Sequence, residues 1–180
     1  MLYNYNEILK IYKDDYSIKR AIQNKEIFKI GRGLYSNEPN VHYLKIISKK
    51  YLYAVISGHS AYYYHNLTDV IPRKIIVCTD RHSTRINNSS IKQIHMKDEL
   101  YNLGKTQIEY DGIVINIYDK ERLLIDLARN KNKMGYDLYK EIISNYRKIS
   151  DTLNIKKIEE YISYFTNGDK LFEIIQNEVF

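Results

Sequence analysis

A serine and a histidine that could take part in hydrolysis lie together in the segment Ser57-Gly58-His59-Ser60. Their spacing differs from the Gly-x-Ser-x-Gly turn of serine hydrolases, and no acidic residue follows at a position that would orient His59. We therefore interpret this segment as the start of a helix, with Ser57 as the N-cap and His59 against the aromatic residues that follow.

Metal-dependent chemistry would need histidines, cysteines or carboxylates that converge. The histidines lack the spacing that joins two ligands on one helix face; they are His42, His59, His65, His82 and His95. Asp80 could pair with Glu109 or Asp126 in a nuclease-like metal site, although nothing in their spacing is specific. A single cysteine, Cys78, excludes an internal disulfide and follows an apolar run typical of a buried strand. The sequence predicts no metal site and no cofactor.

Nucleic-acid binding is the chemistry that the N-terminal residues favour. A short basic helix is followed by Gly31-Arg32-Gly33, which is typical of a tight hairpin between two strands. A helix that reads the major groove beside a strand pair that touches the backbone is the pattern of a winged helix-turn-helix. We expect the following residues to contact DNA: Ser17, Lys19, Arg20, Gln23 and Asn24 in the groove, and Lys29 and Arg32 at phosphates or in the minor groove.

The charge balance agrees with a polyanionic partner, since the chain carries a formal net charge of +6. The abundance of Lys, Asn, Ile and Tyr also fits an A/T-rich genome, which would account for part of this charge. A second basic surface is predicted in the middle of the chain, for DNA or for an RNA-linked partner. An ordinary solvated face would explain the same residues equally well: Arg73, Lys74, Arg81, Arg85 and Lys92, with Lys97 beyond them.

Two domains must position these residues. Residues 1–37 should form a truncated winged helix, with one helix over residues 4–11 and a second ending near Asn24. Its inward residues are expected to be Tyr5, Ile8, Leu9, Ile18, Ala21 and Ile22.

Residues 38–180 should form an α+β domain. It begins with a short helix and has strands over residues 74–79 and 91–96, then a hairpin at Asp111-Gly112. From Asp119 the apolar period changes to the helical one, which predicts a helical C-terminal tail. No apolar run is long enough to span a membrane, and the N-terminal residues are too polar for a signal peptide, so we expect a cytoplasmic protein.

Three blocks of the sequence, in this order, resemble the AbiEi antitoxins of abortive-infection, type IV toxin–antitoxin systems. The first resembles the family's strand-turn-strand, the second its Ser-His-x-(Ser/Thr)-Ala block, and the third its Glu-Arg-Thr-Leu-x-Asp helix start. The blocks are Ile27–Tyr35, Ser57–Pro72 and Tyr118–Leu127. Gly58 is an extra or shifted residue within the second block, and Asn66 replaces its glycine. Two helices rather than three precede the hairpin.

The resemblance implies a winged helix that represses the protein's own phage-defence operon at inverted repeats in double-stranded DNA. It also implies a second domain that neutralises a nucleotidyltransferase-like toxin without a stable complex. We expect a non-enzymatic transcriptional regulator that forms a two-fold dimer at least on DNA. Two alternatives remain: a nucleic-acid-processing enzyme derived from a nuclease, and a protein-interaction module that has lost DNA binding.

Overall fold

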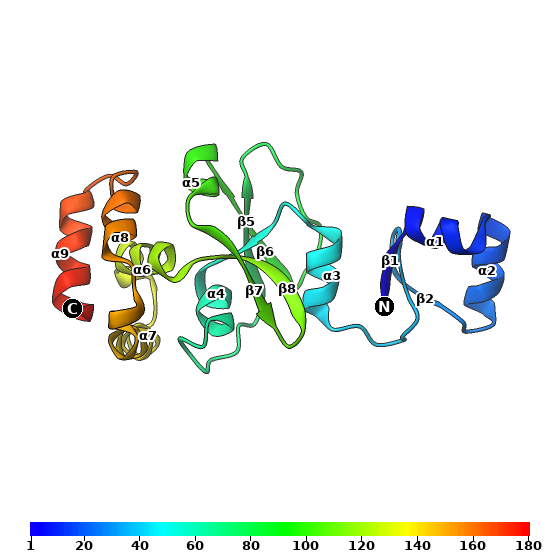
Figure 1. Ribbon diagram of the computed structural model, residues 1–180, viewed down its shortest axis with the longest axis horizontal. Helices are drawn as coiled ribbons and strands as arrows, with labels where there is room; N and C mark the ends of the chain where they lie inside the picture. The colour runs from blue at the N-terminus through cyan, green and yellow to red at the C-terminus, as the bar shows by residue number, and fades with distance from the viewer. The chain divides into compact units, whose positions relative to one another are not determined.

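The computed structural model describes all 180 residues, which form two compact units, Met1–Leu52 and Tyr53–Phe180 (Figure 1). Both units mix helices and strands, and the chain ends in helices, so the fold is α+β as the sequence predicts. The units divide after Leu52 rather than after residue 37. The reason is the helix α3 (Tyr43–Lys50), which contacts the first strand of the N-terminal unit.

The first unit contains a sheet of three short strands and two helices that share a core with it. The middle strand β3 is hydrogen-bonded to β1 on one side and to β2 on the other, and both pairs are antiparallel. Its elements before α3 are β1 (Leu2–Asn4), α1 (Tyr5–Tyr12), α2 (Asp15–Gln23), β2 (Phe28–Gly31) and β3 (Leu34–Ser36). The sequence did not predict β1, because the apolar pattern of three residues is too short to show a period.

Side-chain caps begin both N-terminal helices. Asn4 accepts the backbone N–H of Glu7 at 2.9 Å, and the Glu7 carboxylate accepts the N–H of Asn4 at 2.8 Å, which forms a capping box. Asp14 accepts the N–H of Ser17 at 2.7 Å at the start of α2. These caps satisfy backbone donors that the first helical turn leaves without partners. They explain why both helices begin within a residue or two of the positions that the sequence predicts.

The core of the first unit lies between the two helices and the strands. Ile8, Ile18 and Ala21 are buried there, as the sequence predicts, together with Ile27 and Tyr35 of the strand region. The prediction for Tyr5 was wrong. Its side chain is 38% exposed, and its hydroxyl donates to Asp15 at 2.8 Å.

The second unit contains a five-stranded mixed sheet with the order β6-β5-β4-β8-β7. β5 pairs with β6 and β4 with β8 in parallel, and the other neighbours are antiparallel. The strands are β4 (Val55–Ile56), β5 (Ile75–Asp80), β6 (Ile91–Met96), β7 (Lys105–Tyr110) and β8 (Ile113–Tyr118). The predicted hairpin is confirmed, since Asp111 and Gly112 both have positive φ angles at its turn.

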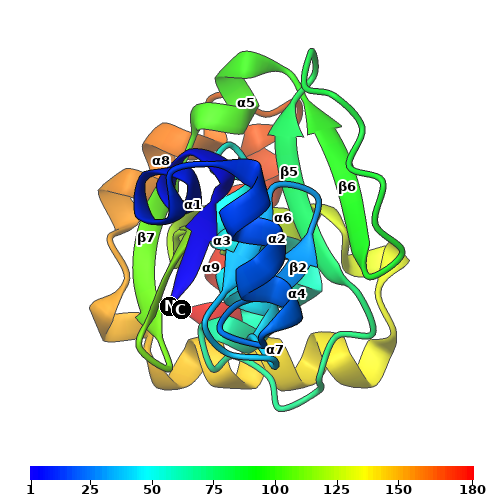
Figure 2. The ribbon, with the colours of Figure 1, turned by 90° about the vertical axis from the view of Figure 1, so that its right-hand side faces the viewer.

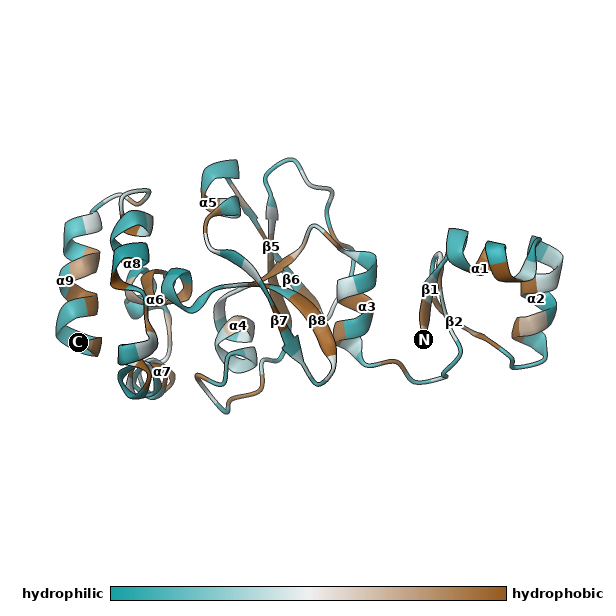
Figure 3. Ribbon diagram, in the orientation of Figure 1, coloured by the Kyte–Doolittle hydropathy of each residue, from teal (hydrophilic) through white to brown (hydrophobic).

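Helices cover the sheet and form the C-terminal end of the second unit, where α6, α7, α8 and α9 lie together (Figure 1). Apolar colour is concentrated on β8, whose Ile113, Ile115 and Ile117 are buried (Figure 3). The helices are α4 (Gly58–Tyr64), α5 (Asp98–Asn102), α6 (Lys120–Arg129), α7 (Tyr136–Lys148), α8 (Ile155–Ile162) and α9 (Gly168–Val179). No helix in either unit combines the length and the apolar character that crossing a bilayer requires.

A fully buried arginine, Arg122, joins the sheet to the helical end of the second unit. Its guanidinium donates to the carbonyls of Leu100 at 2.7 Å and Leu103 at 3.1 Å, and to Asp126 at 3.1 Å. The guanidinium carbon also lies 4.9 Å from the ring centres of both Tyr118 and Phe165. One side chain therefore holds a loop, a strand and two helical segments in place.

Candidate nucleic-acid interface

The exposed face of α2 carries cations that the sequence assigns to DNA. Because Ile18 and Ala21 are buried, the helical period turns Lys19, Arg20 and Gln23 outward, and all three are exposed. Neither Lys19 nor Arg20 forms an ion pair within the protein. Their charges are therefore available to a polyanion.

A tyrosine that the sequence analysis missed lies on the same face. Tyr16 is 76% exposed and precedes Lys19, Arg20 and Gln23 by three, four and seven residues, which places it above them on one side of α2. A phenolic hydroxyl is a common donor to phosphate oxygens. The helical spacing of Tyr16 relative to Lys19 and Arg20 could have identified this residue.

The side chains of two residues that were predicted to enter the groove form hydrogen bonds within the first unit instead. Ser17 is half-buried, and its hydroxyl donates to Asp14 at 3.2 Å, beside the N-cap bond. The side-chain amide of Asn24 donates to Glu26 at 3.1 Å at the C-terminal end of α2. These bonds direct both side chains to helix ends, so the cationic face of α2 is narrower than the sequence predicts.

The hairpin between β2 and β3 presents Arg32 at its turn, and Arg32 and Lys29 are both exposed. Lys29 lies opposite Tyr35 in the register, and the pairing shifts between Lys29 and Gly31. Of the two glycines, Gly33 has a positive φ, of 70°, and Gly31 does not. Gly33 supplies the left-handed conformation that the turn needs.

Acidic residues limit how DNA could approach α2. Asp14 and Asp15 are exposed at the N-terminus of α2, where their negative charges interact favourably with the helix dipole. The backbone N–H of Ser17 lowers the pKa of Asp14, which keeps that carboxylate ionised. The cationic part of α2 is thus its second half rather than its first turn.

The predicted second basic surface lies in the second unit, around β5 and β6. Lys74 and Arg85 line a cavity of about 460 Å³ on one face of this strand pair. Arg73, Lys74 and Lys92 line another of about 450 Å³ with His59. Arg81 lines neither cavity, and its Nε donates to the ring of His82 at 2.9 Å.

The serine–histidine segment has a structural role. Ser57 is the N-cap residue of α4 as predicted, but its hydroxyl makes no cap bond and instead accepts the Cys78 thiol at 3.1 Å. Ser60 binds β5 through its hydroxyl, which accepts the N–H of Ile76 at 2.8 Å. Burial raises the pKa of the Cys78 thiol to about 11, so Cys78 is the buried strand residue that the sequence predicts.

The acids considered for a nuclease-like metal site, Asp80 with Glu109 or Asp126, lie on separate elements, and the carboxyl group next to Asp80 is that of Asp98. Asp126 is bound by Arg122 and Arg129, at 3.1 and 3.3 Å. Glu109 lies on the edge strand β7, whereas Asp80 ends β5 and accepts the N–H of His82 at 2.8 Å. No three histidine, cysteine or acidic side chains converge as a metal site. Asp80 therefore pairs with neither Glu109 nor Asp126, the partners considered for such a site.

Neither a protein-family model nor a curated protein matches this chain.

Proposed function

We propose that this protein is a DNA-binding antitoxin that represses its own toxin–antitoxin operon. The observation that carries the DNA-binding part is the exposed face of α2, on which Lys19 and Arg20 have no ion-pair partner, together with Arg32 on the hairpin. The antitoxin part is supported by the resemblance of three ordered sequence blocks to the AbiEi family.

The chemistry of these side chains suits a DNA duplex. Arg20 can donate two parallel hydrogen bonds to a guanine, and Gln23, one turn further, can bind an adenine in the same way. Arg32 on a narrow hairpin suits a phosphate or the minor groove. In this proposal the unit acts as a winged helix in which α3, after the hairpin, takes the place of a helix before it.

The partners follow from the same proposal. Inverted repeats present two equivalent half-sites, so two modules related by a two-fold axis would bind the operator. The second unit would oppose a nucleotidyltransferase-like toxin in the cytoplasm without forming a stable complex with it. No activity as an enzyme is part of this proposal.

The test is a binding titration with a DNA fragment from upstream of the gene, beside a random fragment of equal length, at several salt concentrations. Arg20→Ala and Gln23→Ala should reduce discrimination between the two fragments by about 1–3 kcal/mol each. Arg32→Ala should weaken binding to both fragments alike and reduce the salt slope by about one unit. Tyr16→Ala should also weaken both alike, without changing the slope, because a phenol releases no counterion.

Lys10→Ala is the matched control, because Lys10 is an exposed cation on α1. It should bind both fragments as the parent protein does. If Arg20→Ala, Gln23→Ala and Arg32→Ala also bind like the parent, the first unit is not a DNA reader, and the interaction-module alternative replaces this proposal. Co-expression with the downstream gene tests the antitoxin part separately, since growth should recover only when the antitoxin is present.

A further inference from the structure

The connection between β5 and β6 is unusual, because these neighbouring parallel strands are joined without a helix (Figure 2). A parallel pair normally needs a longer crossover, most often helical, that covers one face of the sheet. Here residues 81–90 cross as a loop. The face beside β6 is therefore covered by loop backbone rather than by the side chains of a helix.

One glutamine, Gln93, holds this loop in place. Its side-chain oxygen accepts the N–H of Ile86 at 2.7 Å, and its amide donates to Thr79 at 2.9 Å and to the carbonyl of Thr84 at 3.1 Å. The Ile86 side chain is itself buried. The loop is thus anchored at its centre, and the residues after Ile86 form a fixed rim.

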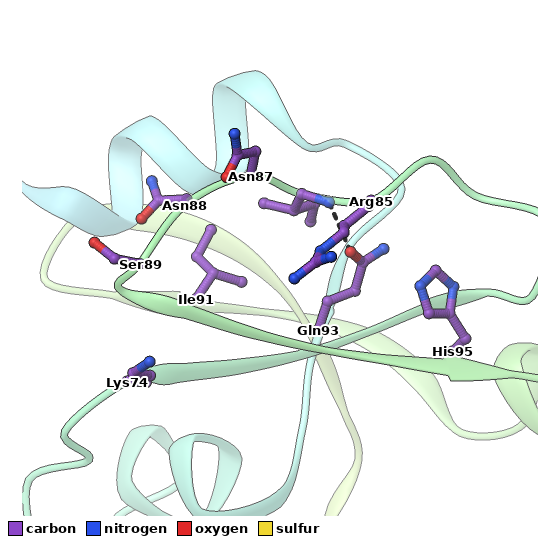
Figure 4. A pocket seen from close by; sticks show the side chains of 9 residues that line it. Lys74, Arg85, Asn87, Asn88, Ser89, Ile91, Gln93 and His95 are labelled. Atoms are coloured by element: carbon purple, nitrogen blue, oxygen red, sulfur yellow. Dashed lines mark hydrogen bonds between the residues drawn. The ribbon is translucent and has the colours of Figure 1, made fainter.

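The cavity of about 460 Å³ lies between this loop and β6 (Figure 4). Ile91, Gln93 and His95 alternate along β6 and so face the same side of the sheet. Arg85 reaches from the loop toward them, and Lys74 lies at the end where β5 begins (Figure 4). The volume is within the range of small-molecule sites in proteins.

The lining of the cavity is cationic and contains no carboxylate. Lys74, Arg85 and His95 line it together with the neutral groups of Asn87 and Ser89, and no aspartate or glutamate does so. Neither Lys74 nor Arg85 forms an ion pair. Cations that converge on a concave surface without counter-charges concentrate a positive potential there, and a guanidinium matches phosphate geometry.

The cavity is longer than one phosphate. In the register, Ile75 lies opposite Ile91 and Thr79 opposite His95. Lys74, one residue before Ile75, and His95 therefore mark ends that are five residues apart, or about 17 Å. If Lys74 and Arg85 hold the anionic group of a ligand, the end of the cavity at His95 has room for another part of the same ligand. The exposed imidazole ring there offers a flat face on which a base can stack.

We propose that this cavity binds a nucleoside phosphate, with its phosphates between Lys74 and Arg85 and its base at His95. The nucleotide is either free in solution or the 5′-phosphorylated end of a single strand, which present the same chemistry. This site is independent of the proposed function, because it uses no residue of α2 or of the β2–β3 hairpin.

Calorimetric titration of the full chain tests the site with four probes: ATP, UTP, inorganic pyrophosphate and a 5′-phosphorylated RNA hexamer. Arg85→Ala and Lys74→Ala should each weaken nucleotide binding by roughly tenfold or more. His95→Ala should weaken nucleotide binding by roughly fivefold or more and leave pyrophosphate binding unchanged. Lys92→Ala is the matched control, because Lys92 lies between Ile91 and Gln93 and so projects from the opposite face of β6.

The outcomes distinguish a free nucleotide from a strand end, and this nucleotide site from the proposed DNA-binding surface. Saturable binding of ATP or UTP without the hexamer identifies a free nucleotide, whereas tighter binding of the hexamer that Arg85→Ala abolishes identifies a strand end. The proposal is overturned if no probe binds below about 1 mM. The proposal is also overturned if pyrophosphate binds as tightly as ATP and UTP. It is overturned as well if Lys92→Ala weakens nucleotide binding as much as Arg85→Ala does. Arg20→Ala should not change nucleotide affinity, so failure of DNA binding and failure of this site are distinguishable.

Discussion

Replacing Arg122 with methionine should remove much of the stability of the second unit. The variant loses the ion pair with Asp126 and leaves the carbonyls of Leu100 and Leu103 without their donors. A buried carbonyl without a partner costs about 1–3 kcal/mol, and breaking a buried ion pair from one side costs about 3–5 kcal/mol. These costs overlap because they belong to one side chain, and a methionine side chain can still pack against the rings of Tyr118 and Phe165. We therefore expect a loss of about 3–5 kcal/mol.

The loss should also depend on pH, and the sign follows from Asp126. Burial raises the pKa of this carboxyl group, and Arg122 provides the largest opposing effect. Without Arg122 the folded protein holds the Asp126 proton to higher pH than the unfolded chain does. Stability then falls as pH rises through that interval, because ionisation favours the unfolded state. The difference in stability between the parent and Arg122→Met should therefore grow as pH rises above about 4, the ordinary range of an aspartate.

Urea unfolding followed by circular dichroism measures both effects. Arg129→Met is the matched control, since Arg129 also binds Asp126 but is 39% exposed, and it should cost less than about 1 kcal/mol. The double variant Arg122→Met, Asp126→Leu should recover part of the loss, because no unpaired charge stays buried. A cost below about 1 kcal/mol for Arg122→Met, or one that does not change with pH, would refute the reasoning.

Two further predictions concern local conformation and protonation. Gly104 and Gly112 have φ angles of 76° and 71°, but a Cβ at Gly104 would lie 2.5 Å from the Cβ of Arg122, whereas one at Gly112 meets nothing within 4 Å. Gly112→Ala should cost about 1–2 kcal/mol and Gly104→Ala clearly more in urea unfolding; equal costs would contradict this. Burial lowers the pKa of His65, whose Nε2 lies 2.8 Å from the Tyr118 carbonyl. Stability should therefore fall as pH drops from about 7 to 5, and His65→Gln should reduce that dependence in the same assay.

The elements that the sequence predicts correctly are those with local signals. Asn4, Asp14 and Asp119 are N-cap residues whose side chains bond the helix that follows them. Asp111 and Gly112 adopt the positive φ angles that a tight hairpin requires. In each case the residue and the group that it serves lie within a few positions, so the sequence around them contains the whole interaction.

Long-range interactions account for what the sequence did not predict. β4 is only two residues long, yet it is the central strand, because it pairs with β5 and with distant Ile117 of β8. The alternation of apolar residues shows that a strand has a buried face but does not identify its neighbours. The burial of Arg122 depends on carbonyls of α5 and of the turn after it, and on Phe165 of a later segment. The candidate site shows the same limit, since Lys74 and Arg85 line one cavity while Arg81 binds His82 elsewhere.

The charge order along α2 links the stability of the first unit to its proposed binding of DNA. Asp14 and Asp15 stabilise the helix at its N-terminus, where Asp14 also supplies the cap, whereas Lys19 and Arg20 follow in the middle turns. The same carboxylates repel phosphates, so in the proposed complex a duplex would meet α2 on its basic half, with Tyr16 at the border of the contact. Recognition helices commonly read bases with their N-terminal residues. In this protein, the residues that begin the helix would set the direction from which DNA can approach it.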